Sequence, residues 1–284
     1  MELPFHVDLT NKTAVVTGGS GVLGSVFSEA LAAAGANVVV LARNQEKVDN
    51  VTARIRNQGG ECLGYSVDVL DKKAMEKVYE EVKETFGPCN ILINGAGGNH
   101  PKATTTGERF APEDLQDENN QTFFDLDPQA VNELFQLNYL GTLVPTQVFA
   151  RDMAVLDEES AIINISSMNA VQPLTKIPAY SGAKSAISNF TQWLAVHFSA
   201  AGVRVNAMAP GFFQTEQNRD LLFDKDGRPS ERAGKILSQT PMERFGTPQD
   251  LVGTLLWLVD ERASGFVNGI VVPVDGGFSA YSGV

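Results

Sequence analysis

The chain has 284 residues, 43% of them hydrophobic, so it can bury a sizeable core and a disordered protein is excluded. Its net charge of −12 comes from 22 basic and 34 acidic residues without a Lys/Arg cluster, which argues against a nucleic-acid or membrane partner. Neither Cys62 nor Cys89 has metal-ligand spacing around it, so we expect no metal and a reducing compartment. The N-terminus lacks a signal-peptide pattern and no apolar run is long enough to span a bilayer, so we expect a cytoplasmic protein.

The first predicted unit is a strand, a glycine-rich turn, a helix and a second strand. Residues 13–17 and 37–41 have the composition of short buried strands, and the turn contains Gly18, Gly21 and Gly24. Glycines let the backbone approach a pyrophosphate, whose charge the helix N-terminus stabilises. This context is the one that a dinucleotide-binding turn requires.

Strand and helix then alternate along the chain. Further strands are expected at 63–67, 90–94, 161–165, 203–209 and 270–274. Helices are expected at 45–57, 72–86, 128–154, 179–199, 231–239 and 248–259. This alternation predicts a parallel sheet with helices on both faces. We expect the α/β class, with residues 1–284 forming a single-domain, Rossmann-like, doubly wound parallel sheet.

Several candidate residues follow strand ends, where ligands bind on such sheets. They are Gly18–Gly24, Asp68, Asn94–Gly97, Ser167 and Pro210–Gly211. Because the strands are parallel, these ends should meet at one site. Two long segments, near 98–127 and 212–247, interrupt the alternation, and connections of this length are usually binding loops or lids. The second begins after Pro210–Gly211, at the edge of the sheet where the candidate residues should meet, so we interpret it as a substrate lid. The alternative for the first is a surface insertion.

Tyr180 and Lys184 lie four residues apart in the predicted helix, so they share one face. Ser167 follows a strand and can face them across a loop. A phenol with a pKa of about 10 is a poor acid at neutral pH, and a nearby ammonium lowers that pKa. The three residues therefore predict a proton donor to a carbonyl oxygen, with Ser167 bonded to the same oxygen.

Taken together, these motifs resemble the short-chain dehydrogenase/reductase family over essentially the whole sequence. The matching pieces are Thr17–Gly24, Asp68–Val69, Asn94–Gly97, Asn138, Ser167, Tyr180, Lys184, Pro210–Gly211, Thr215 and Val274–Gly277. One departure is Val22, which stands where short-form members usually have glycine, and another is Gly95 in place of asparagine. The resemblance implies an NAD(P)-dependent oxidoreductase acting on CH–OH groups, and a homotetramer with the Tyr/Lys helix in one interface.

The resemblance also implies the site residues. The catalytic tetrad would be Asn138, Ser167, Tyr180 and Lys184, with Lys184 also holding the nicotinamide ribose and Asn138 a water chain. The cofactor would bind Gly18, Ser20, Gly21, Val22, Leu23, Gly24, Arg43, Asp68, Val69, Asn94, Ala96, Gly97, Tyr180, Lys184, Pro210, Gly211, Phe213 and Thr215.

Cofactor choice stays open at this point. The second strand leads into Arg43 and Asn44, with no acidic residue to bind a ribose 2′-hydroxyl. Arg43 is placed to meet a 2′-phosphate, which favours NADP, whereas the implied family reaction favours NAD. We expect Asp68 to accept a hydrogen bond from the adenine amino group, the alternative being a loop cap.

A narrower resemblance is to D-mannonate oxidoreductases of the short-chain type, also called fructuronate reductases. It is carried by residues 95–104, 175–178, 210–213 and 276–283. It implies NAD(P)H-dependent interconversion of D-fructuronate and D-mannonate in bacterial hexuronate breakdown. Candidate substrate-binding residues in the loops are Asn99, His100, Lys102, Asn169, Gln172, Lys176 and Arg219.

Other functions remain open. A related oxidoreductase would act on another polyol or keto acid, such as 5-ketogluconate. A redox sensor would bind dinucleotide without turnover, although such proteins typically lose the tyrosine or the lysine. An epimerase or dehydratase is suggested only by the glycine spacing.

Overall fold

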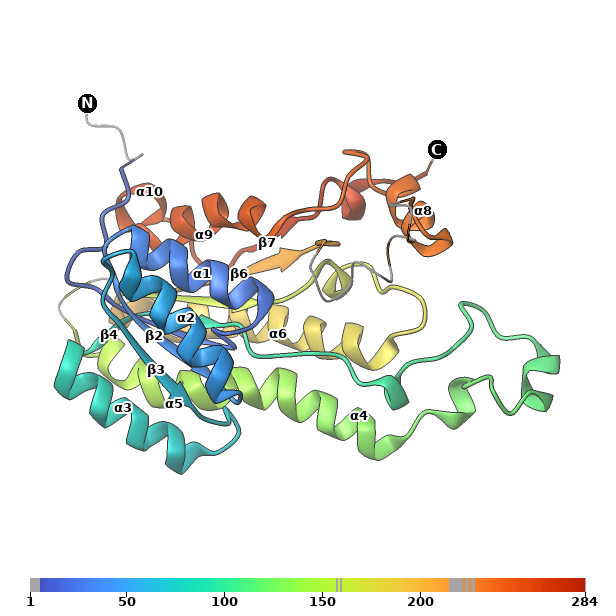
Figure 1. The fold of residues 1–284 in the computed structure, drawn as a ribbon, viewed down its shortest axis with the longest axis horizontal. Helices are drawn as coiled ribbons and strands as arrows, with labels where there is room; N and C mark the ends of the chain where they lie inside the picture. Colours follow the sequence, from blue (N-terminus) through green and yellow to red (C-terminus); the bar gives the residue numbers. More distant parts are fainter. Residues whose placement is uncertain are drawn as a thin grey trace.

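The computed structural model describes residues 6–156, 158, 160–214, 222, 225 and 228–283, which fold around one parallel sheet (Figure 1). The strand order is β3-β2-β1-β4-β5-β6-β7, and every neighbouring pair is parallel. The strands are β1 (Thr13–Thr17), β2 (Asn37–Ala42), β3 (Cys62–Ser66), β4 (Cys89–Asn94), β5 (Ser160–Ile165), β6 (Val203–Pro210) and β7 (Val271–Val274). The prediction of a doubly wound, Rossmann-like α/β fold is confirmed.

Helices cover both faces of the sheet because side chains alternate along each strand. Val16 points into a core with α1, α2 and α9, whereas Val15 points into the opposite core with α3, α5 and α6. The helices are α1 (Val22–Ala33), α2 (Gln45–Asn57), α3 (Lys72–Phe86), α4 (Pro128–Phe135), α5 (Gly141–Met153), α6 (Pro178–His197), α8 (Glu231–Ser238), α9 (Val252–Val259) and α10 (Glu261–Ser264). Within the described ranges, none of them is long and apolar enough to cross a membrane.

The helix expected at 128–154 is interrupted. α4 and α5 are joined by a π-helical turn, Gln136–Leu140, in which Asn138 is fully buried. A π-turn inserts one extra residue into the helix and so changes which side chains face inward. This turn is the local feature that places Asn138.

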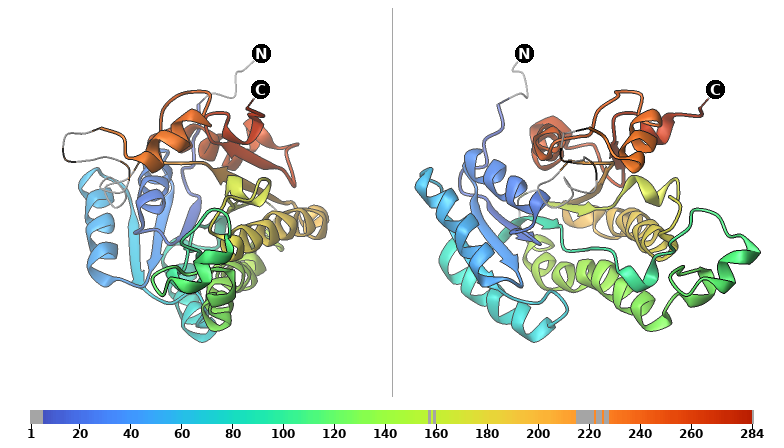
Figure 2. Two further views of the ribbon diagram at one scale, coloured as in Figure 1. Left: turned by 90° about the vertical axis from the view of Figure 1, so that its right-hand side faces the viewer. Right: turned by 45° about the vertical axis from the view of Figure 1, so that its right-hand side comes forward.

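Two segments extend beyond the sheet. Residues 98–127 form an arm of short 3₁₀ turns that projects from the body of the molecule (Figures 1 and 2). The arm is tied back where Thr105 N donates to the Lys176 carbonyl (2.8 Å) and where Glu108 pairs with Lys235 of α8 (3.3 Å).

The second segment leaves β6 and returns before α9, and its two ends are joined. Phe213 and Gly246 form a parallel β-bridge, in which Gln214 N donates to the Gly246 carbonyl (2.8 Å) and Gly246 N to the Phe212 carbonyl (2.9 Å). Between these ends lies α8, whose buried Ala233 and Ile236 pack with Phe212.

Candidate active site

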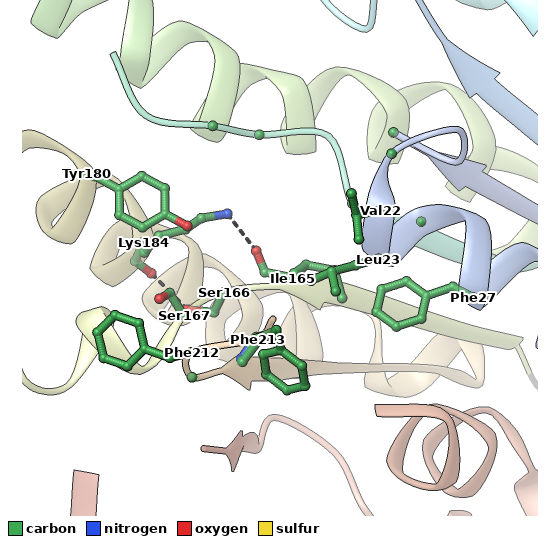
Figure 3. A pocket seen from close by; sticks show the side chains of 18 of the residues that line it. Val22, Leu23, Phe27, Ile165, Ser166, Ser167, Tyr180, Lys184, Phe212 and Phe213 are labelled. Carbon is green, nitrogen blue, oxygen red and sulfur yellow. Dashed lines mark hydrogen bonds between the residues drawn. The ribbon is translucent and has the colours of Figure 1, made fainter. Parts of the chain in front are cut away.

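The carboxyl ends of the central strands surround a cavity of about 500 Å³. Figure 3 shows Tyr180, Ser167 and Phe212 toward one end of it and Val22, Leu23 and Phe27 toward the other. Its lining consists of Gly18, Gly21, Val22, Leu23, Gly24, Phe27, Gly95, Gly97, Gly98, Ile165, Ser166, Ser167, Tyr180, Lys184, Pro210, Gly211, Phe212, Phe213, Leu222, Arg232 and Ile236.

The glycine-rich turn closes one end of the cavity by tight backbone contact. Gly18 has a φ of +64°, and a Cβ there would lie 2.8 Å from the Gly95 oxygen. A Cβ at Gly24 would lie 2.1 Å from the Gly18 oxygen, so only glycine fits. α1 begins at Val22 with no side chain capping its first turn, which leaves its N–H groups available. These features fit a dinucleotide pyrophosphate.

A second hollow of about 300 Å³ continues from this turn on the side of β2 and β4. Its lining includes Ser20, Arg43, Asn44, Lys47, Val69, Ala96 and Gly97. The sequence patterns did not predict Lys47 as a site residue, because only its place in the first turn of α2 brings it beside Arg43. Among the described residues, Asp68 is not part of this lining. Its carboxylate accepts from Leu70 N (2.9 Å), the loop cap weighed as the alternative to adenine binding.

α6 presents Tyr180 and Lys184 to the cavity beside the end of β5. The Lys184 ammonium donates to the Ile165 carbonyl (2.8 Å) and lies 5.7 Å from the centre of the Tyr180 ring. Ser167 follows β5, and its hydroxyl lies close enough to the Tyr180 phenol to act on the pKa of that phenol. Serine, phenol and ammonium thus gather at one point, as the spacing predicts.

Burial changes the acidity of both residues. It raises the pKa of Tyr180, and the neighbouring Ser167 hydroxyl offsets this rise only in part. It lowers the pKa of Lys184 to about 8, because an ammonium loses hydration in the interior. The net shift of the Tyr180 pKa is therefore upward in this structure, because burial outweighs the lowering that the sequence predicts from Lys184. The phenol is held protonated, which suits a proton donor.

Asn138 lies next to this group. Its amide donates to the carbonyls of Leu134 (2.9 Å) and Gly98 (2.8 Å), and it accepts from Gly98 N (3.3 Å). A Cβ on Gly97 would lie 2.7 Å from the Asn138 oxygen and 3.3 Å from the Lys184 nitrogen. Asn138 therefore connects the base of the arm to the surroundings of Lys184.

Asn94, expected at the cofactor, instead has a structural position. It is 2% exposed, and its amide donates to Asn164 of β5 and Thr146 of α5, each at 2.9 Å. Asn164 in turn donates to Thr191 of α6 (2.9 Å). These bonds join strands and helices below the site.

Two of the candidate substrate residues of the loops, Asn99 and His100, form hydrogen bonds within the arm. Asn99 donates to Thr104 (3.0 Å), and His100 accepts from Lys102 N (3.2 Å), so both close a turn of the arm. Asn169 is buried, and its backbone N–H donates to the Ser167 hydroxyl (3.3 Å). In the described part of the protein, none of Asn99, His100, Lys102, Asn169, Gln172 or Lys176 lines the cavity. Thr215 and Arg219 lie outside the described residues.

The sequence reading missed the far wall of the cavity, formed by Phe212, Leu222, Arg232 and Ile236. A helix at 231–239 was expected, and its apolar positions were a signal that one face is buried. Nothing in that pattern shows that the helix folds back over the site.

The chain is similar to known proteins over its whole length. A model of the short chain dehydrogenase family matches residues 12–226. An "uncharacterized oxidoreductase" of Haemophilus influenzae is 55% identical, across 100% of this chain and 99% of the relative. The "uncharacterized oxidoreductase UxuB" of Bacillus subtilis is 50% identical, across 99% of this chain and 100% of the relative.

A crystal structure of a "putative D-mannonate oxidoreductase" of Haemophilus influenzae with bound NAD has a TM-score of 0.94 and 53% identity, and each chain is covered completely. This agreement confirms the resemblance and the prediction of an NAD(P) cofactor. Because the family model spans most of the sequence, the protein belongs to the short-chain dehydrogenase family and is an NAD(P)-dependent oxidoreductase of alcohol or ketone groups.

Proposed function

We propose that this protein interconverts D-fructuronate and D-mannonate, with NAD(P)H as the reductant of the keto group. The observation that carries the proposal is the meeting of Ser167, Tyr180 and Lys184 in one cavity whose other end is closed by the glycine turn (Figure 3). The substrate is supported by the resemblance to the relative named a "putative D-mannonate oxidoreductase".

In this proposal the bound cofactor supplies the hydride to the carbonyl carbon. Tyr180 donates its phenolic proton to the carbonyl oxygen, which Ser167 holds by a hydrogen bond. Lys184 stabilises the phenolate that remains and positions the nicotinamide ribose. Asn138 holds the water that returns a proton to this group.

The cofactor-binding set of the proposal combines the glycine turn with residues of the second hollow. Gly18, Gly21, Val22, Leu23 and Gly24 bind the pyrophosphate. Pro210, Gly211 and Phe213 line the end of the cavity that holds the nicotinamide. Among the described residues that line this hollow, Arg43 and Lys47 provide two cations and there is no carboxylate, so we expect NADPH to be accepted as well as NADH.

The test is the loss of NADH and NADPH absorbance with D-fructuronate, 5-ketogluconate and an uncharged ketone. We expect rapid oxidation with D-fructuronate. Faster oxidation with 5-ketogluconate would replace the substrate with that keto acid. Tight dinucleotide binding without oxidation would favour a sensor, and product formation without net NAD(P)H loss would favour an epimerase or dehydratase.

We also propose a homotetramer with α6 in one interface. Trp193 is 56% and Val196 77% exposed on this helix, and Trp193 stacks on His197 with 4.6 Å between ring centres. An exposed apolar face of this kind usually marks a protein interface. Light scattering should give the mass of four chains, and Trp193→Glu should reduce it. A monomeric wild-type protein at assay concentration would refute this assembly.

A further inference from the structure

The cavity contains one cation that the proposed mechanism does not use. Among the described residues that line it, only Lys184 and Arg232 carry a charge. Lys184 is 5% exposed and donates to the Ile165 carbonyl. Arg232 is exposed on α8, and no carboxylate of the described residues lies within ion-pair distance of its guanidinium.

Lys235, the neighbouring cation on α8, does have anionic partners. Lys235 pairs with Glu108 of the arm (3.3 Å) and with Glu231 (3.4 Å), and it is not among the described residues that line the cavity. Two cations on α8 are therefore placed differently. Lys235 holds the helix to the arm, while Arg232 lines the cavity without an anionic partner in the described ranges.

The packing of α8 indicates which end of the cavity Arg232 serves. The buried residue that follows it, Ala233, packs with Ile236 against Phe212. Phe212 lies toward the same end of the cavity as Tyr180 and Ser167, and the glycine turn lies toward the other (Figure 3). Arg232 therefore belongs to the helix that covers the substrate end.

We propose that Arg232 binds the carboxylate of the substrate and sets the preference for sugar acids over neutral sugars. This inference rests on the proposed reductase function and assigns a binding residue to it. A planar guanidinium can form two parallel hydrogen bonds to a carboxylate. D-Fructuronate carries its keto group and its carboxylate near opposite ends of six carbons, so the cation must lie apart from Tyr180.

The experiment compares D-fructuronate with D-fructose, which has a hydroxymethyl group in place of the carboxylate. We expect Arg232→Gln to lower the ratio of the two kcat/KM values by about ten- to a hundredfold, because one charge-assisted interaction is lost. Arg232→Lys should recover part of the ratio. Lys235→Gln, the matched control on the same helix, should leave it within about twofold.

The dissociation constant for NADH, measured by fluorescence without substrate, separates the two anions that an arginine here can meet. It should be unchanged in Arg232→Gln. A higher NADH dissociation constant would assign Arg232 to the pyrophosphate and overturn the proposal, as would equal losses with both sugars.

A binding measurement distinguishes failure of this inference from failure of the proposed function. D-Gluconate, a non-reducible sugar acid, is titrated into the NADH complex by calorimetry. Binding to the wild type that is lost in Arg232→Gln supports acid recognition even if D-fructuronate is not reduced. Equal binding to both proteins, or no binding to the wild type, overturns it.

Discussion

The ammonium of Lys184 donates a hydrogen bond to the carbonyl oxygen of Ile165, with 2.8 Å between the two atoms. Ile165 is the last residue of β5, and Ser167 follows two residues later. This bond therefore fixes the cation at the strand end that also presents the serine. The positions of the Lys184 ammonium and of Ser167 relative to Tyr180 are therefore set by the same short piece of backbone.

Removing the phenolic oxygen should stop proton donation. We expect Tyr180→Phe to lower kcat by about 10²- to 10⁴-fold, the usual contribution of a general acid. The dissociation constant for NADH should stay within about twofold. Tyr65→Phe on β3, outside the cavity, is the control and should retain activity. Substantial turnover by Tyr180→Phe would remove this residue from the mechanism.

Keto reduction should depend on pH through Lys184. Burial lowers its pKa to about 8, so the side chain is protonated below that pH and neutral above it. Only the protonated form stabilises the phenolate left after proton donation. We expect kcat/KM for reduction to be level between about pH 6 and 7.5 and to fall as the pH rises through about 8. Stopped-flow measurement in a single mixed buffer checks this, and an unchanged rate up to about pH 10 would contradict it.

The two cations of the second hollow, Arg43 and Lys47, should matter for the binding of NADPH and not of NADH. Arg43→Gln should raise the dissociation constant for NADPH by about tenfold, because a charge-assisted hydrogen bond to the 2′-phosphate is lost. The constant for NADH should change little. Arg54→Gln is a suitable control, since Arg54 lies on α2, eleven residues after Arg43, but pairs with Glu29 at 2.7 Å. Equal weakening of both cofactors would show that Arg43 does not discriminate between them.

Gly24 should tolerate no side chain. A Cβ there would lie 2.1 Å from the Gly18 oxygen. This oxygen belongs to the backbone, so it cannot move aside as the end of a flexible side chain could. We expect Gly24→Ala to lower the free energy of unfolding by about 1–3 kcal/mol and to weaken NADH binding. Gly253→Ala is the control, because a Cβ at that helical position meets no atom within 4 Å. It should be neutral or slightly stabilising in urea unfolding.

The strands and most helices could be predicted because their patterns are local. The strand expected at 63–67 is β3 at Cys62–Ser66, and the helices at 45–57 and 72–86 have the bounds of α2 and α3. Such patterns depend on which residues are apolar, which the sequence states directly. The π-turn at Gln136–Leu140 could not be predicted, because the residues on both sides of it keep a helical pattern and the extra residue shifts that pattern by only one position.

In the site, too, the residues that local patterns place could be predicted, and those that depend on packing between distant elements could not. Most motif residues follow strand ends or, like Tyr180 and Lys184, lie on one face of a helix, and most of them line the two hollows. Asn94 also follows this logic in position, but which way its amide points depends on Thr146 and Asn164, far away in sequence. Arg232 and Lys47 depend on how whole helices pack. Sequence patterns predict a helix more readily than they predict its neighbours.

The bridge between Phe213 and Gly246 has a consequence for how this enzyme can change. Because the two ends of the covering segment are fastened to each other beside β6, its interior can lengthen, shorten or exchange residues while the strand ends keep their positions. Hydride and proton transfer would then remain intact while substitutions in the covering segment change which substrate the cavity accepts. In such an arrangement chemistry and selectivity can evolve as separate parts of one protein.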